Sequence, residues 1–452
     1  MSMDHPMPRT PFILIGGFAA AVVLSGCGDE TALPKGADTG PNPSLPKPVT
    51  SAVPTVNVAP AKGWATGELP TAAAGLTVGA FARGLNHPRS ILVLPNGDVL
   101  VAESNAPPKE QSTGIRGFVM KLVMVRAGAG VPSPNRVILL RDADGDGTAE
   151  VRSTYIEGLT SPFGLTLIGD RLYVANADSI VAFPYVAGSD KITAAAEKIV
   201  DLPGGPLNHH WTKSLIASPD GRFLYVGVGS NSNVGENGME MEKDRAAILE
   251  VDVTAKTMRP FATGLRNPVG MAWEPGTKAL WTVVNERDEL GSDLVPDYLT
   301  KVIDGGFYGW PYSYFGTTVD ERVTPQRPDL VAKAVVPDYA LGAHTASLGL
   351  AFSPSQSWPR DLAQGAFIAQ HGSWNRKPHS GYKVVFVPFE NGRPNGAMRD
   401  VLTGFLSDDG DALGRPVSVA FTQNGTLLVT DDVGNAVWSV RPQATQSDVS
   451  AQ

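Results

Sequence analysis

Histidine and arginine residues recur at equivalent points in five of six similar segments of this chain. An imidazole can accept and donate protons near neutral pH, and a guanidinium group binds carboxylates through paired, charge-assisted hydrogen bonds. Together these groups suit proton transfer on a small molecule that carries negative charge. The residues at these points are His87 and Arg89, His209, His210 and Lys213, Arg266 and Asn267, His344, and Arg415.

The six segments share a pattern that predicts where these side chains lie. Each runs from a Gly or His through a turn into an apolar stretch, a second turn and a second apolar stretch. Such repeats at intervals of roughly 50 to 80 residues are typical of a β-propeller, and six copies predict six blades. The innermost strands of a propeller begin near one mouth of its channel, so the polar residues before them should share one site. The segments begin at Gly84, Gly158, His210, Gly264, His344 and Gly414.

Composition agrees with one large all-β domain. The 452 residues include 49 Gly and 37 Pro, which suits many short strands and turns. We expect the six-bladed propeller to span residues 64–442 and a disordered tail to follow over 443–452. The net charge of −8 disfavours nonspecific nucleic-acid binding, which needs a basic surface.

The N-terminus carries an export signal. An apolar run over residues 11–24 leads into Ser25-Gly26-Cys27, and Cys27 is the single cysteine of the chain. This ending resembles the lipobox of bacterial lipoproteins, so we expect a lipoprotein signal peptide over 1–27, lipidation of Cys27 and a periplasmic or cell-surface location. The alternative is an ordinary signal peptide with an incidental cysteine. The polar, Pro-rich residues 28–63 predict a disordered linker that tethers the propeller to a membrane.

Two interpretations of the cationic set are open. The side chains could plug the channel and pair with acidic neighbours, or they could bind a ligand. Several cations in one place must be neutralised, and a small molecule with several carboxylates would do so.

Three motifs add a resemblance to this argument. Residues 208–215 read NHHWTKSL, residues 264–271 read GLRNPVGM, and residues 304–311 read DGGFYGWP. In this order they resemble the soluble quinoprotein glucose dehydrogenase and sorbosone dehydrogenase family, six-bladed propellers that use pyrroloquinoline quinone (PQQ) and calcium. Residues 285–298 are more similar to the sorbosone and pyranose branch than to the glucose branch.

The resemblance implies PQQ-dependent oxidation of a sugar, polyol or aldehyde of the sorbosone or aldose type. A base takes a proton from the substrate while hydride passes to the quinone. The chain lacks the Cys-x-x-Cys-His signature of covalent haem. Electrons would therefore pass to an external acceptor, a cytochrome or a quinone.

The same resemblance assigns roles to individual residues. It makes His210 the catalytic base, and it places Arg266 and Asn267 beside the reactive carbonyls of the cofactor. His209 is the rival base, and because consecutive strand residues point to opposite sides, only one of the pair should face the quinone. The glucose branch has Asp where this chain has His209, so the base must be oriented differently here. Further cofactor contacts are expected from Arg415, Arg376, Arg89, Trp374 and His209.

Two acidic clusters are candidate calcium sites. Glu286 and Asp288 stand where the glucose branch has its calcium loop, and they could bind calcium or pair with Arg266 and Arg287. A second cluster has carboxylates at positions 1, 3, 5 and 9 of a Gly-containing loop, which suits the many oxygen ligands of calcium. The alternative is a solvated acidic turn. This cluster consists of Asp142, Asp144, Asp146 and Glu150.

Two other functions compete with a dehydrogenase. A calcium-dependent lactonase-like propeller is disfavoured because the Arg and His residues would repel a metal ion. A non-catalytic propeller that binds a glycan or a protein is disfavoured because His210 and Arg266 are both present.

Overall fold

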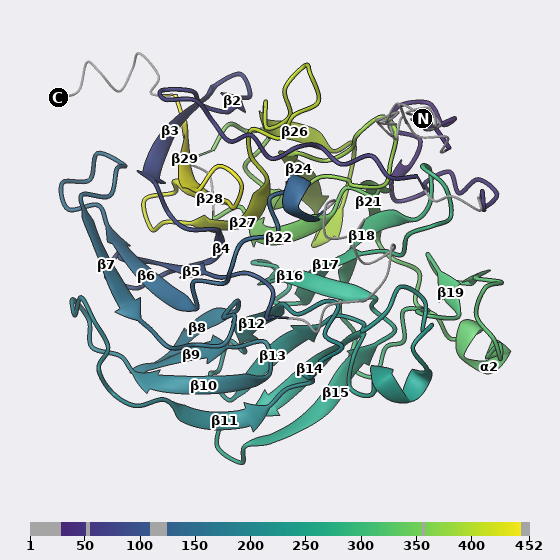
Figure 1. Ribbon diagram of the computed structural model, residues 1–452, viewed down its shortest axis with the longest axis horizontal. Coiled ribbons are helices and arrows are strands. Elements are labelled where there is room, and N and C mark those ends of the chain that lie inside the picture. The colour runs from purple at the N-terminus through teal and green to yellow at the C-terminus, as the bar shows by residue number, and fades with distance from the viewer. Residues whose placement is uncertain (1–28, 51–54, 109–123, 355–357, 444–452) are drawn as a thin grey trace, which may run out of the picture.

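The computed structural model describes residues 29–50, 55–108, 124–354 and 358–443, which form an all-β, six-bladed propeller. Its six main sheets stand around a common centre (Figure 1). Every innermost strand begins within a few residues of the polar positions that the repeats predict. These strands are β4 (Pro88–Val93), β8 (Leu165–Ile168), β12 (Lys213–Ala217), β16 (Asn267–Trp273), β22 (Ser347–Phe352) and β27 (Pro416–Phe421).

Each innermost strand is followed by antiparallel partners toward the rim. In the first three blades these are β5 (Val99–Glu103), β6 (Arg136–Arg141) and β7 (Val151–Ile156); β9 (Arg171–Ala175), β10 (Ser179–Pro184) and β11 (Glu197–Asp201); and β13 (Phe223–Val228), β14 (Ala247–Asp252) and β15 (Thr257–Thr263).

The next two blades are larger. The fourth adds β17 (Leu280–Asn285), β18 (Pro296–Lys301) and β21 (Tyr339–Ala343), with β1 (Thr39–Gly40) at its edge. The fifth adds β23 (Gly365–Gln370), β24 (Lys383–Glu390) and β26 (Arg399–Thr403), with β2 (Thr71–Ala72) and β25 (Arg393–Pro394). Short elements between blades are η1 (Met239–Glu242), β19 (Ser313–Tyr314), β20 (Thr318–Val319) and α2 (Pro328–Val331).

The sixth blade closes the ring with strands from both ends of the propeller. It contains β27, β28 (Leu427–Asp431), β29 (Ala436–Pro442) and β3 (Leu76–Arg83). The register of β29 with β3 runs from Ala436 opposite Arg83 to Pro442 opposite Leu76. An N-terminal strand therefore completes the last sheet and joins it to the first blade.

The core lies between neighbouring sheets, because the two faces of each blade carry alternating apolar side chains. A separate cluster fills the channel itself, where Phe163, Val269, Leu348 and Val417 pack together with Trp211. Val269 and Val417 follow Asn267 and Arg415 by two residues in the innermost strands. The channel is thus plugged by apolar side chains directly beneath the polar strand starts.

The segment before the propeller differs from the disordered linker that we expected. Its described residues, 29–50 and 55–63, lie along the blades, and Thr39 and Gly40 pair with Leu341 and Ala340 of β21. Ala59 is fully buried in the core between the fifth and sixth blades. Backbone pairing and burial compensate for the small, polar composition that predicts disorder.

The expected signal peptide and lipidated Cys27 lie outside the described residues, as does all of the expected tail except Gln443. Within the described residues, no helix has the length and apolar character needed to cross a membrane.

Candidate active site

A cavity of about 430 Å³ lies at the mouth of the channel where the innermost strands begin. This volume lies in the range of small-molecule binding sites. The structure brings together nine of the residues predicted from the sequence for catalysis, a cofactor or a metal at this mouth. They are His209, His210, Arg266, Asn267, Arg415, Arg89, Trp374, Glu286 and Asp288.

His210 is held in one tautomer. Its Nδ1 lies 2.7 Å from the carbonyl oxygen of Ser230. A carbonyl only accepts hydrogen bonds, so Nδ1 carries the proton and Nε2 keeps its lone pair. Burial, followed by the positive charges of Arg266 and His209, holds the pKa of His210 well below its usual value. The imidazole is therefore neutral at pH 7 and able to accept a proton.

Two neighbours fix the loop that carries His210. Gly229, directly after β13, has no side chain because a Cβ there would collide with Asn267 Oδ1 and with His210 Cβ. Lys213, fully buried at the start of β12, points its Nζ at the carbonyl oxygens of His210, at 3.4 Å, and of Trp211, at 3.2 Å. The close approach at Gly229 and the contacts of Lys213 therefore fix the backbone that carries the imidazole.

The expectation that only one of the two adjacent histidines faces the site is wrong. Both His209 and His210 line the cavity, with ring centroids 4.8 Å apart and planes at 78°. The pair precedes β12 and is not part of the strand, so the alternation of strand side chains does not apply to it.

Arg266 belongs to a tightly paired cluster on the fourth blade. Its guanidinium donates to the carbonyl oxygen of Glu286 at 2.6 Å, to Asn233 Oδ1 at 3.0 Å and to the Asp288 carboxylate at 3.2 Å. Asp288 also accepts from Asn375 at 2.8 Å and contacts His344. Burial favours the neutral acid, but His344, Arg266 and Asn375 outweigh it and hold the pKa of Asp288 far below its usual value.

His344 is the cationic counterpart of His210. Its Nε2 lies 2.9 Å from the carbonyl oxygen of Gly291 and its Nδ1 lies 3.4 Å from the carboxylate of Asp288. The Gly291 carbonyl only accepts, so Nε2 carries a proton, and the nearby carboxylate favours a second proton on Nδ1. Burial opposes this charge, yet the hydrogen bond and charge of Asp288 raise the pKa of His344 above its usual value.

A second cluster surrounds Asp432, which directly follows β28 in the sixth blade. Its carboxylate pairs with Arg89, lies 2.9 Å from His371 Nε2 and lies 3.8 Å from His87 Nε2. Burial lowers the pKa of His371 to about 4 despite this carboxylate. His371 is therefore neutral, and its Nε2–H donates to Asp432.

Arg415 differs from the other two arginines of the cavity. Its side chain is buried, yet among the described residues no carboxylate lies within ion-pair distance of it. Its closest acceptors are the carbonyl oxygens of Ala59 at 3.4 Å and Gly372 at 3.5 Å, and its Nε has no partner. The guanidinium also packs 4.9 Å from the ring of Tyr382. A buried cation without a counter-ion is suited to an anionic ligand.

Sequence reasoning missed several polar residues that line the cavity, among them Asp432, Asp297, Asn375 and Asn105. A simple signal points to the first of them. In an antiparallel blade the second strand ends at the mouth where the first begins. Residues directly after the second strands therefore also face the site, and Asn105, Glu286, His371 and Asp432 all occupy such positions.

Arg376 does not line the cavity, in contrast to the predicted cofactor contact. It pairs with Asp38 at 3.1 Å and donates to the carbonyl oxygen of Ala343 at 2.9 Å. It also lies 3.6 Å from Asp293, which binds the backbone N–H groups of Ala32 and Leu33. Arg376 thus anchors the segment before the propeller.

Glu286 and Asp288 pair with arginines, which is the second of the two roles left open for them. Asp288 pairs with Arg266, and the carboxylate of Glu286 accepts from Arg287 Nε at 3.0 Å. Arg287 has no exposed surface and also contacts Asp320 at 3.1 Å. Both carboxylates contact arginines, while the buried Oε1 of Glu286 has no partner, so calcium binding by these two residues stays a prediction.

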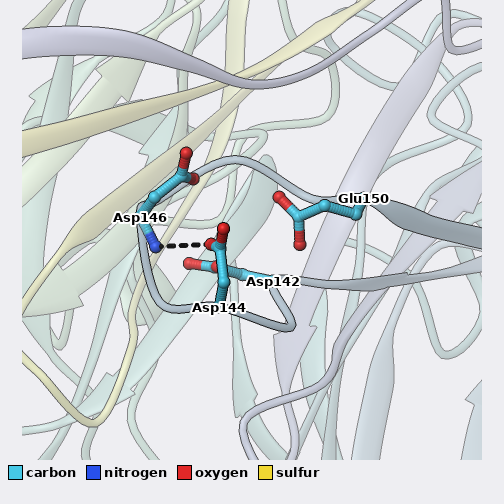
Figure 2. Close-up of side chains that lie close together, drawn as sticks. All are labelled: Asp142, Asp144, Asp146 and Glu150. Atoms are coloured by element: carbon cyan, nitrogen blue, oxygen red, sulfur yellow. Dashed lines mark hydrogen bonds between the residues drawn. The ribbon is translucent and has the colours of Figure 1, made fainter.

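The acidic loop after β6 assembles as its spacing predicts. The ligand oxygens of Asp142, Asp144, Asp146 and Glu150 lie within 4.8 Å of one another. Figure 2 shows the four carboxylates grouped at one turn, where Asp144 also accepts from the Asp146 N–H. Asp144, Asp146 and Glu150 are exposed, and the loop lies apart from the residues that line the cavity.

Similar proteins share both the sequence pattern and the fold. A pyrroloquinoline quinone-dependent pyranose dehydrogenase of Coprinopsis cinerea is 23% identical over 430 residues, covering 81% of this chain and 54% of that protein. A pyrroloquinoline quinone-dependent sugar dehydrogenase of Hypocrea jecorina is 22% identical, covering 83% of this chain and 90% of that protein. This chain thus spans about half of the first relative's length and most of the second's.

A solved structure shows the same propeller. The pyranose dehydrogenase PQQ domain from Coprinopsis cinerea, in its holo form, superimposes with a TM-score of 0.67 at 21% identity, covering 85% of this chain and all of that domain. At this identity the likeness establishes the fold. The profile of the TrAA12-like family matches residues 70–298 and 323–443, and the chain therefore belongs to the TrAA12-like family.

Proposed function

We propose that this protein is a PQQ-dependent sugar dehydrogenase. The observation that carries the proposal is the cavity, where a neutral His210 stands beside buried arginines, one of which lacks a counter-ion. Both named relatives are PQQ-dependent enzymes that act on sugars, which supports the same class of reaction here.

The cavity residues fit PQQ, a planar quinone with three carboxylates. Arg415 offers an unused Nε–H, and Arg89 has an unused Nε–H as well. Asn267 lines the cavity with a buried Oδ1 that has no partner. Charge-assisted bonds from the arginines would hold the carboxylates, and Arg266 and Asn267 would lie beside the reactive carbonyls.

The chemistry on the protein side rests on His210. Its Nε2 accepts the proton of the substrate hydroxyl while Nδ1–H keeps its bond to Ser230, so the ring does not have to turn during the reaction. When bound, PQQ supplies the quinone carbonyl that accepts the hydride, and the substrate leaves as the carbonyl product. Burial, followed by the positive charge of Arg266, lowers the pKa of His210 and so keeps it neutral before the substrate arrives.

The substrate is a sugar or related polyol or aldehyde of the sorbosone or aldose type. This choice follows the resemblance of residues 285–298 to the sorbosone and pyranose branch of the family. Two electrons leave each turnover, so an external acceptor, a cytochrome or a quinone, is required. Calcium is proposed for the loop of Asp142, Asp144, Asp146 and Glu150, whose oxygens converge. Calcium binding by Glu286 and Asp288, which also pair with arginines, stays a prediction.

We also propose that Cys27 is lipidated and anchors the protein to a membrane in the periplasm or at the cell surface. Fractionation of cells that express wild type and Cys27→Ser tests this. The wild type should sediment with membranes and the variant should be released, with its propeller still folded by circular dichroism. A wild type that is fully soluble would contradict the anchor.

The proposed activity is tested with purified protein loaded with PQQ. Reduction of an artificial dye is followed with a panel of pentoses, hexoses, disaccharides and sorbosone. The proposal predicts PQQ-dependent, saturable reduction with at least one sugar. Bound PQQ that no sugar reduces would contradict it.

A further inference from the structure

The chain reaches the propeller through residues 55–64, here called the strap, which run along the rim of the cavity. Val58 is one of the residues that line the cavity, and the next residue, Ala59, is completely buried. By contrast, Val56, two positions earlier, is 46% exposed. Val58 therefore faces the cavity, whereas Val56 faces solvent and Ala59 faces the core.

Hydrogen bonds to two blades fix the strap. The N–H of Asn57 donates to the carbonyl oxygen of Trp374 at 2.8 Å. Farther along, the N–H of Ala412 donates to Pro60 at 2.7 Å, and the N–H of Lys62 donates back to Ala412 at 2.8 Å. A ladder of this kind holds the backbone of residues 57–62 in one path.

The strap ends on a buried carboxylate, Asp431, that also binds the backbone of a residue lining the cavity. Trp64 donates its indole N–H to Asp431 at 2.8 Å and packs edge-on against Trp438. Asp431 also accepts the N–H of Arg415 at 2.7 Å, and the Arg415 side chain reaches the carbonyl oxygen of Ala59. The strap and the arginine proposed to bind PQQ are therefore held by the same group.

We propose that the strap is a wall of the substrate site and that Val58 sets the size of sugar that the cavity admits. The proposal rests on the proposed function and refines it. Val58 shares the cavity with three other apolar residues, Met124, Ala127 and Val433. The histidines that line the cavity come from other segments of the chain than the strap. An apolar wall suits the C–H face of a sugar ring, while its hydroxyls turn toward polar groups.

The location of the strap in the sequence supports a role in selectivity. The match to the TrAA12-like family begins at residue 70, six residues after the strap ends. Val58 is thus supplied by a part of the chain outside that match, whereas the apolar residues that share the cavity with it, Met124, Ala127 and Val433, lie inside it. The cavity's cations and His210 lie inside it.

Kinetics of size variants test the proposal. Val58→Ala and Val58→Phe are compared with Val56→Ala and Val56→Phe, a matched pair on the exposed side of the strap. We expect Val58→Ala to raise, and Val58→Phe to lower, the ratio of kcat/KM for a disaccharide over its monosaccharide by about tenfold or more, as removed or added methylenes do in a pocket. The Val56 variants should leave the ratio unchanged.

A second measurement needs no turnover. In a Cys27→Ser background the chain has no cysteine, so Val58→Cys and Val56→Cys each introduce a single thiol. Maleimide labelling is followed with and without saturating PQQ and sugar. A filled cavity should slow labelling of the Val58→Cys thiol roughly tenfold or more, because the open site becomes rare, and should not change the Val56→Cys thiol.

The outcomes separate this proposal from the proposed function. Unchanged sugar ratios in folded, PQQ-loaded Val58 variants, or equal labelling of both thiols with and without ligand, would overturn the strap proposal and leave the dehydrogenase intact. A wild type that binds PQQ but oxidises no sugar would overturn the dehydrogenase. Protection of the Val58→Cys thiol by PQQ alone would then still place the strap at the cavity.

Discussion

The central cavity and the loop after β6 are both crowded with charge, but the charges are arranged in opposite ways. In the cavity, arginines and histidines alternate with carboxylates, and most are buried and paired. In the loop, four carboxylates gather largely exposed, satisfied only by backbone N–H groups. The cavity therefore keeps a positive charge without a counter-ion at Arg415 and suits an anion. The loop keeps negative charge without a counter-ion and suits a cation.

The contrast shows that acidic residues alone do not define a metal site. Glu286 and Asp288 look similar in sequence to the loop carboxylates, yet each is matched by an arginine within 3.2 Å. What separates the two regions is the presence of arginine side chains beside the carboxylates, which the fourth blade itself supplies. The predictions below test the cavity and the loop separately.

The largest expected effect concerns the proton acceptor. His210→Ala should lower kcat by roughly 10²–10⁴-fold, the usual contribution of a positioned base. PQQ should still bind, because the arginines hold its carboxylates. Single-turnover kinetics of the PQQ-loaded variant, compared with His209→Ala, make the measurement. Near-normal kcat in His210→Ala, or a larger loss in His209→Ala, would reassign the base.

The next largest effect is expected on PQQ affinity when Arg415, the cation without a counter-ion, is removed. Arg415→Ala should weaken PQQ binding by roughly 10–100-fold, since hydrogen bonds to charged groups contribute about 1.5–3 kcal/mol. Equilibrium titration of PQQ-free protein measures the change. Arg399→Ala, which removes an arginine paired with Asp361 at the surface, is the matched control. Equal affinities in the two variants would place the ligand elsewhere.

The blades, their inner strands and most of the charged residues and histidines of the cavity were predictable from the repeats and motifs. Periodic turns and apolar runs reflect local strand pairing, and that pairing brings the strand starts together. Partners from different segments were not predictable. The pairing of Arg376 with Asp38 joins residues 338 positions apart, and only the folded chain shows that it removes Arg376 from the site. Likewise, composition cannot reveal that Thr39 and Gly40 pair with β21.

The two cavity histidines with opposite shifts give a pH-dependent effect. The pKa of His344 is raised in the folded protein, so its pair with Asp288 stabilises fully below about pH 6.5, and this stabilisation is lost as the pH rises through the folded value. Chemical denaturation of wild type and His344→Gln should therefore show a larger stability difference at pH 5.5 than at pH 8.5. A difference that grows with pH would contradict a charged His344.

His210 should behave in the reverse sense. Its lowered pKa means that the unfolded chain binds its proton more readily, so this group favours unfolding as the pH falls below about 6.5. Imidazole nitrogen NMR of PQQ-free protein at pH 6.5, assigned with His210→Ala, should show a neutral ring protonated at Nδ1. A doubly protonated ring would contradict the hydrogen bond to Ser230.

The smallest effect is expected at the acidic loop. Calcium should raise the thermal unfolding temperature of wild type by a few degrees, as a stabilisation of about 1–2 kcal/mol would, and Asp144→Asn should lose this shift. Dye reduction by the PQQ-loaded protein should not change, because the loop lies apart from the cavity. A calcium shift that persists in Asp144→Asn would remove the ion from this loop.

The account depends most directly on whether PQQ occupies the cationic cavity. Calorimetric titration of PQQ into PQQ-free wild type, Arg415→Ala and the double variant Arg266→Ala/Arg415→Ala measures this without any assumption about the sugar. The account predicts one PQQ per chain in the wild type, weaker binding in the single variant and a further loss in the double variant. No saturable binding to the wild type, or equal binding by all three proteins, would contradict it.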